Sequence, residues 1–440
     1  MQPHSTTDLQ TATLTRLKTV MERRQVKLSE ITFDPKVYPR GEHDPALVQR
    51  YVGVLDQIEE RKHFMAVGLD LRLADGRHRQ LAYLTRYKDD PDHIVTVQVY
   101  PVSSDADMLD LAADLNGESG WQLTEDHKKQ TAVQMYQEFG RTQEHIAAKL
   151  HVGLSRVNEW LRGVLEAQRK RRESMIWSMW LACHTQAEIA ETVGLERNTV
   201  TEILQKMSEN YSREDSDIFR DFDPEVYQVW NFAKLTNKTR VFGSVPQEVV
   251  DNLLYYYTKP LDVVFDPFGG GGATVDVCLK RLRRYYVSDL SPIPARTDLR
   301  TWDMTEGLPP DLPVPDLVYL DPPYWKQAEK KYSEKETDLG NVDLPAFLKT
   351  IGTTARLVKR KWGGDRPNGR LAMIIGFCKD DHRYLDLPFL CYKAITKYLT
   401  PIWRIQVPYS TQVHGGAYVK AAQEQKEMLY LTRDLMVFGP

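Results

Sequence analysis

The stretch Leu261–Leu282, LDVVFDPFGGGGATVDVCLKRL, decides the fold of the second half of the chain. Its apolar run Val263–Phe265 predicts a buried strand, the four glycines at 269–272 predict a tight turn, and the residues after them have helical spacing. A phosphate-binding loop would place Lys and then Ser or Thr after the glycines, and this loop does not. The glycines instead let the backbone turn sharply and let a ligand lie close against it.

Further apolar runs follow this helix and alternate with helical segments. The strand-like runs are residues 283–291, 315–325 and 369–378, followed by a helix at 392–399 and a strand–turn–strand at 427–438. Strands that alternate with helices predict an α/β fold with a largely parallel, doubly wound, Rossmann-like sheet.

Acidic residues stand where these strands end. Asp266 ends the first strand, Asp289 ends the next, and Asp303 follows. A carboxylate at the end of the first strand repels phosphate but suits an ammonium group or a hydroxyl, and an acid about 20 residues later commonly binds a ribose diol. S-adenosylmethionine, which carries a ribose, an adenine and a cationic amino-acid part, fits this pattern better than a dinucleotide. The alternative is a plain strand–turn–helix in which the glycines serve only the turn.

The tetrapeptide Asp321-Pro322-Pro323-Tyr324 ends the third strand, at the edge where open α/β sheets place their sites. The Asp321 carboxylate and the Pro322 carbonyl can both accept from the amino group of an aromatic base. This frees the lone pair of the nitrogen for attack on a methyl sulfonium. Tyr324 offers a face on which a flipped base can stack, and Trp325 can widen that wall. The alternative is a proline turn at a strand end.

Together these motifs resemble those of the DNA amino-methyltransferases, over residues 222–440. DPFGGGGAT at 266–274 is similar to the cofactor motif of that family, DPPY at 321–324 to its catalytic motif, and residues 242–260 to its first cofactor helix. DPPY in this family more often accompanies adenine. The resemblance therefore implies site-specific transfer of a methyl group to N6 of adenine in double-stranded DNA, with cytosine N4 as the alternative.

The resemblance also implies which residues act. The catalytic residues would be Asp321, Pro322, Pro323 and Tyr324. The cofactor residues would be Asp266, Phe268 (or Phe265), Gly269, Gly271, Thr274, Asp289, Asp303 and Asp321, with residues 239–245 closing over the cofactor.

An internal repeat predicts a second function in the first half of the chain. TQEHIAAKLHVGLSRVNEWL begins at Thr142 and TQAEIAETVGLERNTVTEIL begins at Thr185. Each copy has a capping Thr, a short helix, a turn and a second helix, which is the layout of a helix-turn-helix. We expect an all-α DNA-binding region at 120–210. Its DNA contacts would be Ser155, Arg156 and Asn158 in the first copy, Arg197, Asn198 and Thr201 in the second, and Arg169 and Arg171 in the basic run between them.

The segment ADGRHRQLA at 74–82 resembles the conserved box of the ParB/sulfiredoxin-like fold, which implies an α+β domain at 26–119 closed by an acidic helix at 105–118. In that fold the turn binds nucleotide phosphate, so Gly76, Arg77 and Arg79 would form an anion site for CTP or another nucleotide. Residues 115–124 match the second nucleotide motif only in part, so a scaffold role is the alternative. The fusion implies a phage or mobile-element enzyme, and a restriction-modification role is a further expectation.

Composition sets the remaining limits. A length of 440 residues predicts two or three domains. We expect a flexible tail at 1–25, a linker at 211–222 and the methyltransferase domain at 223–440. No run is long and apolar enough for a membrane span, and the four cysteines are far apart, so we expect a cytoplasmic protein without a metal site or disulfides. A homodimer stays open.

Charge is distributed unevenly. A net charge of −3 argues against a protein that coats nucleic acid by bulk charge, whereas residues 120–172 carry 10 basic and 6 acidic groups. Arg281, Arg283 and Arg284 are interpreted as a solvated face or a phosphate contact.

Two other classes of protein remain as alternatives. One is a ParB-like DNA-binding or partition factor with a degenerate methyltransferase half, against which the intact DPPY argues. The other is an RNA or protein methyltransferase, although two helix-turn-helix copies favour DNA.

Overall fold

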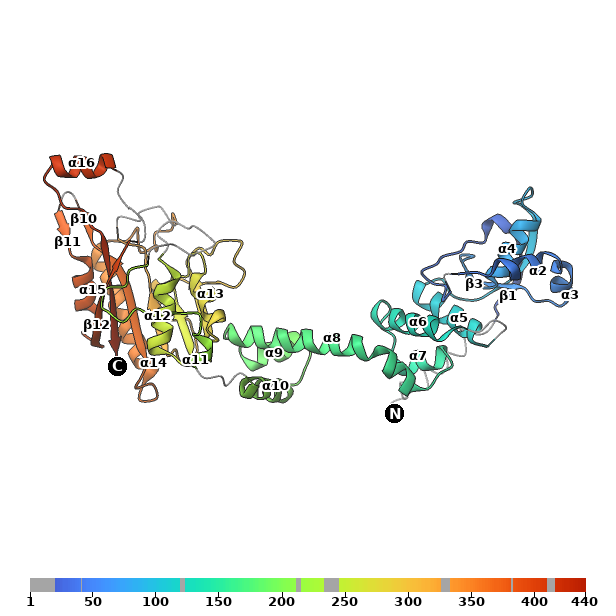
Figure 1. Ribbon diagram of the computed structural model, residues 1–440, viewed down its shortest axis with the longest axis horizontal. Coiled ribbons are helices and arrows are strands. Elements are labelled where there is room, and N and C mark those ends of the chain that lie inside the picture. The colour runs from blue at the N-terminus through green and yellow to red at the C-terminus, as the bar shows by residue number, and fades with distance from the viewer. Residues whose placement is uncertain are drawn as a thin grey trace, which may run out of the picture. The chain divides into compact units, whose positions relative to one another are not determined.

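The structure is a computed structural model that describes residues 20–40, 42–118, 123–210, 215–232, 245–325, 333–380, 383–409 and 416–440. The chain forms two compact units, Met1–Lys170 and Arg171–Pro440, and the division falls within helix α8 (Leu154–Leu181) (Figure 1). The two copies of the repeat therefore belong to different units. The domain boundaries derived from the sequence stay predictions.

The first unit begins with a four-stranded mixed sheet in the order β1-β4-β2-β3. Its strands are β1 (Glu22–Lys27), β2 (Met65–Val67), β3 (Leu73–Asp75) and β4 (Ile94–Val99). β4 runs antiparallel to β1 and parallel to β2, and its residues alternate between buried and more exposed positions, so one face is packed. The helices around it are η1 (Leu28–Glu30), α2 (Pro45–Val52), α3 (Leu55–Glu60), α4 (Arg77–Arg86) and α5 (Asp105–Glu118).

Three further helices complete this unit: α6 (Glu125–Gln137), α7 (Gln143–Lys149) and the first turns of α8. They share a core with α5, in which Met108, Ile146 and Val157 are fully buried. Acidic side chains of α5 pair with basic ones of the first repeat copy, because Asp114 contacts Lys149 at 3.0 Å and both are buried. Part of the positive charge of this copy is therefore neutralised inside the unit.

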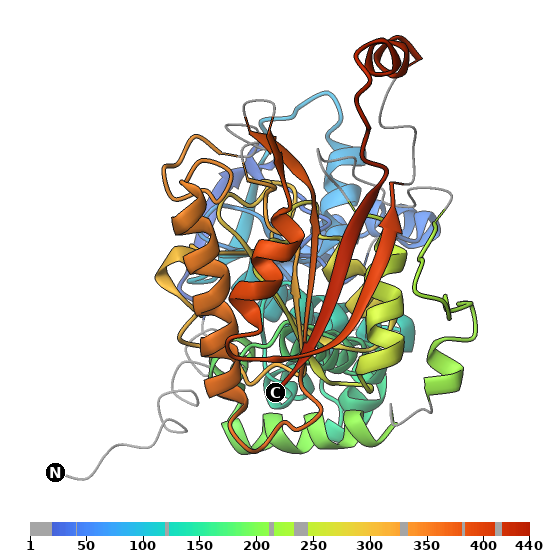
Figure 2. The same cartoon turned by 90° about the vertical axis from the view of Figure 1, so that its left-hand side faces the viewer.

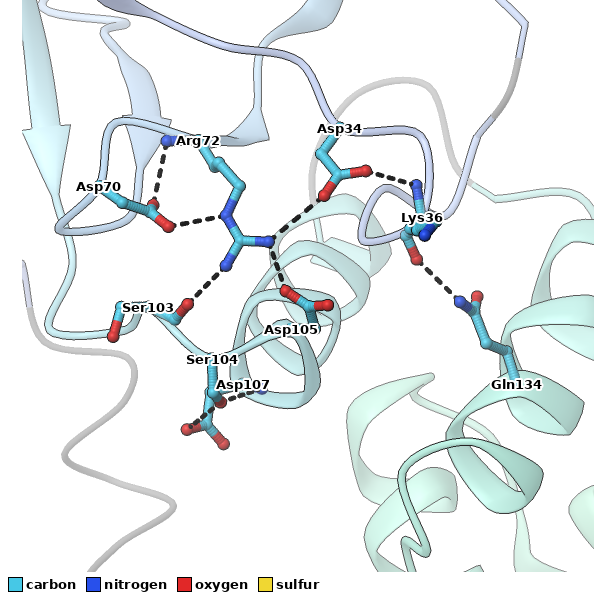
Figure 3. Close-up of polar contacts among 9 residues, drawn as sticks. All are labelled: Asp34, Lys36, Asp70, Arg72, Ser103, Ser104, Asp105, Asp107 and Gln134. Atoms are coloured by element: carbon cyan, nitrogen blue, oxygen red, sulfur yellow. Dashed lines mark hydrogen bonds and ion pairs between the residues drawn. The ribbon is translucent and has the colours of Figure 1, made fainter.

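Arg72 joins three segments of the first unit (Figure 3). Its guanidinium contacts Asp34 at 3.3 Å, Asp70 at 2.7 Å and Asp105 at 2.6 Å. These carboxylates come from the loop after β1, the β2–β3 turn and the start of α5. The partly buried Arg72 side chain thus connects the sheet to α5.

The second unit contains a seven-stranded sheet in the order β12-β13-β9-β8-β5-β6-β7. Its strands are β5 (Val263–Asp266), β6 (Arg284–Asp289), β7 (Arg300–Thr301), β8 (Leu317–Leu320), β9 (Arg370–Gly376), β12 (Thr400–Pro408) and β13 (Thr432–Gly439). The strands from β7 to β9 pair in parallel, whereas β13 is antiparallel to both β9 and β12. A separate hairpin consists of β10 (Cys378–Asp380) and β11 (Arg383–Leu385). The predicted α/β fold class is confirmed, but the predicted strand–turn–strand at 427–438 is wrong, because only residues 432–439 form a strand there.

Alternating residues of the parallel strands fill two cores. Phe265, Val318 and Met373 pack on one face with α14 (Leu344–Trp362) and α15 (Leu387–Ile395). Val264, Leu317 and Tyr319 pack on the other face with α12 (Gln247–Tyr257) and α13 (Ala273–Lys280). Figures 1 and 2 show α14 and α15 on the side of the sheet opposite to α12. The remaining helices of the unit are α9 (Gln186–Val193), α10 (Arg197–Asn210), α11 (Asp215–Ile218), η2 (Met304–Glu306) and α16 (Gly416–Glu424).

Arginines connect the sheet to the helices that precede it. Arg284 donates to the Trp180 carbonyl at 3.2 Å, and Arg300 donates to the Ala182 carbonyl at 3.0 Å. Arg281 is 1% exposed and contacts Asp251 at 2.6 Å, and Arg283 is fully buried. The interpretation of 281, 283 and 284 as a solvated face or phosphate contact is therefore wrong for Arg281 and Arg283, because their guanidinium groups are used inside the fold.

None of the helices among the described residues is long and apolar enough to cross a lipid bilayer.

Candidate active site

The order of the parallel strands places the predicted motifs side by side. The chain runs from β5 outward to β6 and β7, then returns to the other side of β5 as β8. Such a reversal opens a crevice at the carboxyl ends of the two central strands, where α/β folds bind ligands. Asp266 is the last residue of β5, and Asp321 directly follows β8. The glycine loop and the DPPY tetrapeptide therefore meet at one edge of the sheet.

Asp266 shapes the glycine loop from within. One of its oxygens accepts from the Phe268 N–H at 2.8 Å, and the other accepts from the Thr274 hydroxyl at 2.5 Å. Burial raises the pKa of Asp266 to about 7, although these two hydrogen bonds lower it. Asp266 and Thr274 are both buried, so they hold the loop in place and face the interior.

The glycines of this loop are required at specific points. A Cβ on Gly269 would lie 2.5 Å from the Val287 side chain, so only glycine fits there. A Cβ on Gly270 would meet nothing closer than the Phe268 carbonyl at 3.9 Å, so a ligand can approach the loop at this point. Gly270 donates its N–H to Asp289 at 2.9 Å, which joins the loop to the end of β6.

The Asp289 carboxylate can accept further hydrogen bonds from a ligand. Its second oxygen accepts from the Ser291 N–H at 2.9 Å. An ionised carboxylate offers about four lone-pair sites, so oxygens that each accept one backbone N–H can still accept from the two hydroxyls of a ribose. The open side of Gly270 and the Asp289 carboxylate thus fit the ribose and amino-acid parts of S-adenosylmethionine.

Two more acids stand beside Asp289. Asp303 caps η2 by accepting from the Thr305 N–H at 2.9 Å. Asp338 is buried, and burial raises its pKa, as do the charges of Asp289 and Asp303. Lys335 reaches the Leu290 carbonyl at 2.9 Å, so residues after the catalytic loop return to this edge. Asp338 was missed in the sequence, where it lies in a polar stretch without a motif.

The catalytic tetrapeptide is only partly exposed, with Pro322 buried and its other three residues at intermediate exposure. Burial raises the pKa of Asp321 to about 7; the charge of Arg433 lowers it and that of Asp266 raises it. The Tyr324 ring packs over Gly376, where an added Cβ would lie 3.1 Å from Tyr324 Cε2. The Tyr324 hydroxyl is buried, so the outer end of the ring faces protein.

Trp325 does not extend this wall. The side chain is 5% exposed, and its Nε1–H donates to the Val342 carbonyl at 2.8 Å. The prediction that Trp325 widens the base-binding wall is wrong, because the indole belongs to the core beneath α14.

The predicted DNA-contacting residues divide between the two units. Ser155 and Asn158 are exposed at the start of α8, whereas Arg156 pairs with Glu159 at 2.8 Å and also with Glu125. The other exposed candidates are Arg169, on the first-unit side of the division, and Arg171, Arg197, Asn198 and Thr201, in the second unit.

The predicted nucleotide site lies at the start of α4. Gly76 has a φ of 101° and is the N-cap residue, as expected for a tight turn before a helix. Arg79 donates to the His63 and Phe64 carbonyls, each at 2.7 Å, and Arg77 stacks on Phe33 at 3.9 Å. Both arginines have partners within the unit, and nucleotide binding stays a prediction.

Parts of two predicted segments lie outside the described residues. They are residues 239–244 of the segment expected to close over the cofactor, and residues 119–122 of the second nucleotide motif.

Solved structures that resemble the chain at low similarity include the following three. Two are the C-terminally truncated chromosome-partitioning protein ParB from Caulobacter crescentus. The structure with the centromeric parS site has 16% identity and a TM-score of 0.23 and covers 42% of this chain and 99% of its own. The structure with CTP-γ-S has 17% identity, a TM-score of 0.19 and the same coverage. The third, described as a sarcosine dimethylglycine methyltransferase from Galdieria sulphuraria, has 16% identity and a TM-score of 0.28 and covers 44% of this chain and 84% of its own. TM-scores this low carry no argument about the fold.

Two further comparisons concern sequence. None of the curated proteins matches the chain. Residues 122–292 match the N6/N4 model described as DNA methylase. The match includes the glycine loop and Asp289, and it ends before Asp321. Residues 122–292 are therefore similar to the DNA methylase family, and the resemblance to the DNA amino-methyltransferases is confirmed.

Proposed function

We propose that the protein transfers a methyl group from S-adenosylmethionine to N6 of adenine in double-stranded DNA. The observation that carries this proposal is the meeting of two carboxyl groups, Asp266 and Asp321, at the reversal point of the parallel sheet, where burial raises the pKa of both. One organises the glycine loop and the other begins the catalytic tetrapeptide. Cytosine N4 is the second candidate, because the matching family model includes both amino groups.

Each residue has a distinct part in this reaction. Asp289 and the open side of Gly270 would hold the cofactor, which supplies an electrophilic methyl group. Asp321 would accept a hydrogen bond from the target amino group and so make the lone pair of its nitrogen available. Because the pKa of Asp321 is about 7, this carboxyl group can also take up the proton that the methylated nitrogen loses. Tyr324, fixed over Gly376, would stack on the base after it leaves the duplex.

The proposal also includes the features predicted for the rest of the chain. Exposed polar residues at the start of α8 and α10 would contact DNA, and the turn at Gly76 would bind a nucleotide such as CTP or serve as a scaffold. We place the enzyme in the cytoplasm. Methylome sequencing of a host that expresses the protein would give its target sequence.

A methyl-transfer assay tests the proposal. Full-length protein is incubated with duplex DNA and S-adenosylmethionine carrying a labelled methyl group, and the DNA is digested to nucleosides. We expect label in N6-methyladenine, and no label with Asp321→Ala, which should still bind DNA. Label in N4-methylcytosine would show that the target is N4 of cytosine, the second candidate. DNA binding without any transfer by wild type would favour a partition-type factor and defeat the proposal.

A further inference from the structure

Arg433 is a buried cation that the proposed mechanism has not used. It lies near the start of β13, is 3% exposed, and its Nε has no hydrogen-bond partner among the described residues. The adjacent Asp434 is fully paired, because its carboxylate accepts from Arg404 and Gln406, each at 2.6 Å. Burying a cation is costly, so the position of Arg433 needs a specific reason.

Strand register places Arg433 level with the catalytic loop. Arg433 is opposite Gly376 on β9, and Leu320 of β8 is opposite Met373. Gly376 is three residues beyond Met373, so Arg433 stands level with the residues that follow Leu320. These are the residues of the DPPY tetrapeptide, two strands away.

Alternation along the strands puts Arg433 on the same face as Asp321. Leu435 and Val437, which share the parity of Arg433, pack in the core with α12 and α13, and so does Tyr319 of β8. Asp321 follows Tyr319 by two residues and therefore points to that face as well. Asp434 and its partners occupy the opposite face.

Gly376 leaves the intervening strand without a side chain at this level. A Cβ there would lie 3.0 Å from the Tyr409 hydroxyl and 3.1 Å from Tyr324 Cε2. The Arg433 guanidinium lies 4.6 Å from the centre of the Tyr409 ring. Tyr324, Tyr409 and Arg433 therefore gather around the same gap, and the long arginine side chain can extend over it towards the loop.

Arg433 supplies the positive charge that favours the ionised form of Asp321. Burial and the Asp266 charge both disfavour the ionised Asp321 carboxylate, and Arg433 favours it. The tyrosines near Asp321 are neutral at pH 7, because burial raises the pKa of each. The titratable groups that act on Asp321 are Arg433 from β13, Asp266 from β5, Tyr319 from β8, Tyr324 from the loop and Tyr409 after β12.

We propose that Arg433 is a positioning residue for the methyl transfer, acting on the target base through Asp321 and Tyr324. The inference rests on the proposed function. The guanidinium favours the carboxylate form of Asp321, which accepts from the target amino group. Its stacking on Tyr409 also holds a side chain that, like the Tyr324 ring, packs against Gly376.

The first test is the pH dependence of the single-turnover rate in the full chain. Arg433→Gln should move the rising acid limb upward by about 1–2 pH units, which lowers the rate near pH 7 roughly tenfold and restores it near pH 9. Arg433→Lys should keep the limb close to that of wild type. The matched control is Arg404→Gln, which breaks the pair with Asp434 on the opposite face and should leave the limb in place. An Arg433→Gln limb at the wild-type pH would overturn the proposal.

The second test does not depend on activity. Aspartate carboxyl groups are labelled with ¹³C in the full chain, and the Asp321 signal is assigned by its loss in Asp321→Asn. Arg433→Gln should raise the titration midpoint of this signal, and an unchanged midpoint would refute the role of Arg433. Where the Gln variant does not fold, Arg433→Met provides an uncharged side chain of similar length with the same expected result. If wild type transfers no methyl group to DNA, the proposed function fails while this titration still decides the inference.

Discussion

At the scale of single residues, the site combines features that oppose folding. Asp266 and Asp321 are carboxyl groups held away from water, and burial raises the pKa of both to about 7. Arg433 is a buried cation whose charge acts on Asp321. Groups of this kind are tolerated where they serve chemistry, because hydrophobic replacements would pack with less desolvation cost. We therefore expect the site to reduce stability in return for reactivity.

The stability of an Asp321→Asn variant tests this expectation. The folded-state pKa of Asp321 is about 7, above the ordinary value of 3.8. Its neutral form therefore contributes stability that is present below about pH 4 and is lost as the pH rises through about 7. Asparagine stays neutral, so the variant should melt at a higher temperature than wild type at pH 8 and at a similar temperature at pH 4. Thermal unfolding followed by circular dichroism measures this.

Asp311→Asn is the control with the opposite sign. Burial raises the pKa of Asp311, but the hydrogen bond from Tyr286 and the charge of Arg300 together lower it. Removing this carboxylate should therefore destabilise the protein at pH 8. An Asp321→Asn variant that is no more stable than wild type at pH 8 would contradict the burial of a charged Asp321.

At the scale of elements, short sequence patterns predicted the features that depend on residues close together in the chain. The glycine turn, the acid after each central strand and the capping Thr142 and Thr185 all depend on neighbouring residues, and the structure contains each of them. The neighbours of a strand depend on distant segments. The insertion of β13 between β9 and β12 was not predicted, and for that reason Arg433 could not be placed opposite Gly376. The available signal was a pair of charged residues, Arg433 and Asp434, inside an apolar run.

The Arg72 junction in Figure 3 gives a prediction at this scale. Arg72 is 16% exposed in its side chain and contacts three carboxylates from separate segments. Arg72→Ala would leave these acids close together without a cation, so we expect a loss of about 2–4 kcal/mol in the free energy of unfolding of the first unit. Denaturant titration of the full chain measures the change.

Arg86→Ala is the matched control in the same unit. Among the carboxylates of the described residues, Arg86 forms an ion pair with Asp56 alone, at 3.1 Å, and the Asp56 side chain is 74% exposed. An exposed pair of this type contributes about 0–1 kcal/mol. Equal losses in the two variants would mean that the Arg72 contacts do not hold the segments together.

At the scale of the whole molecule, the chain combines two units that each have their own cores. The first unit packs around its mixed sheet and the helices α5 to α7, and the second around the two faces of the seven-stranded sheet. The cofactor candidates all lie in the second unit, and the candidate nucleotide residues all lie in the first. Ligands of the two kinds should therefore stabilise different parts of the chain.

Thermal unfolding of the full chain with and without S-adenosylmethionine tests this division. We expect two transitions, and the Arg72→Ala substitution, which acts in the first unit, identifies which transition belongs to it. A ligand at a hundred times its Kd adds about 2.7 kcal/mol to the unit that binds it. For a unit of this size, the midpoint temperature of the transition of the second unit should rise by roughly 5–10 °C. The midpoint of the transition of the first unit should not change. Asp289→Ala should abolish this rise, because Asp289 holds Gly270 and would bind the ribose. A rise confined to the transition of the first unit would mean that the cofactor binds there. It would contradict the assignment of the glycine loop, which lies in the second unit, as the cofactor site.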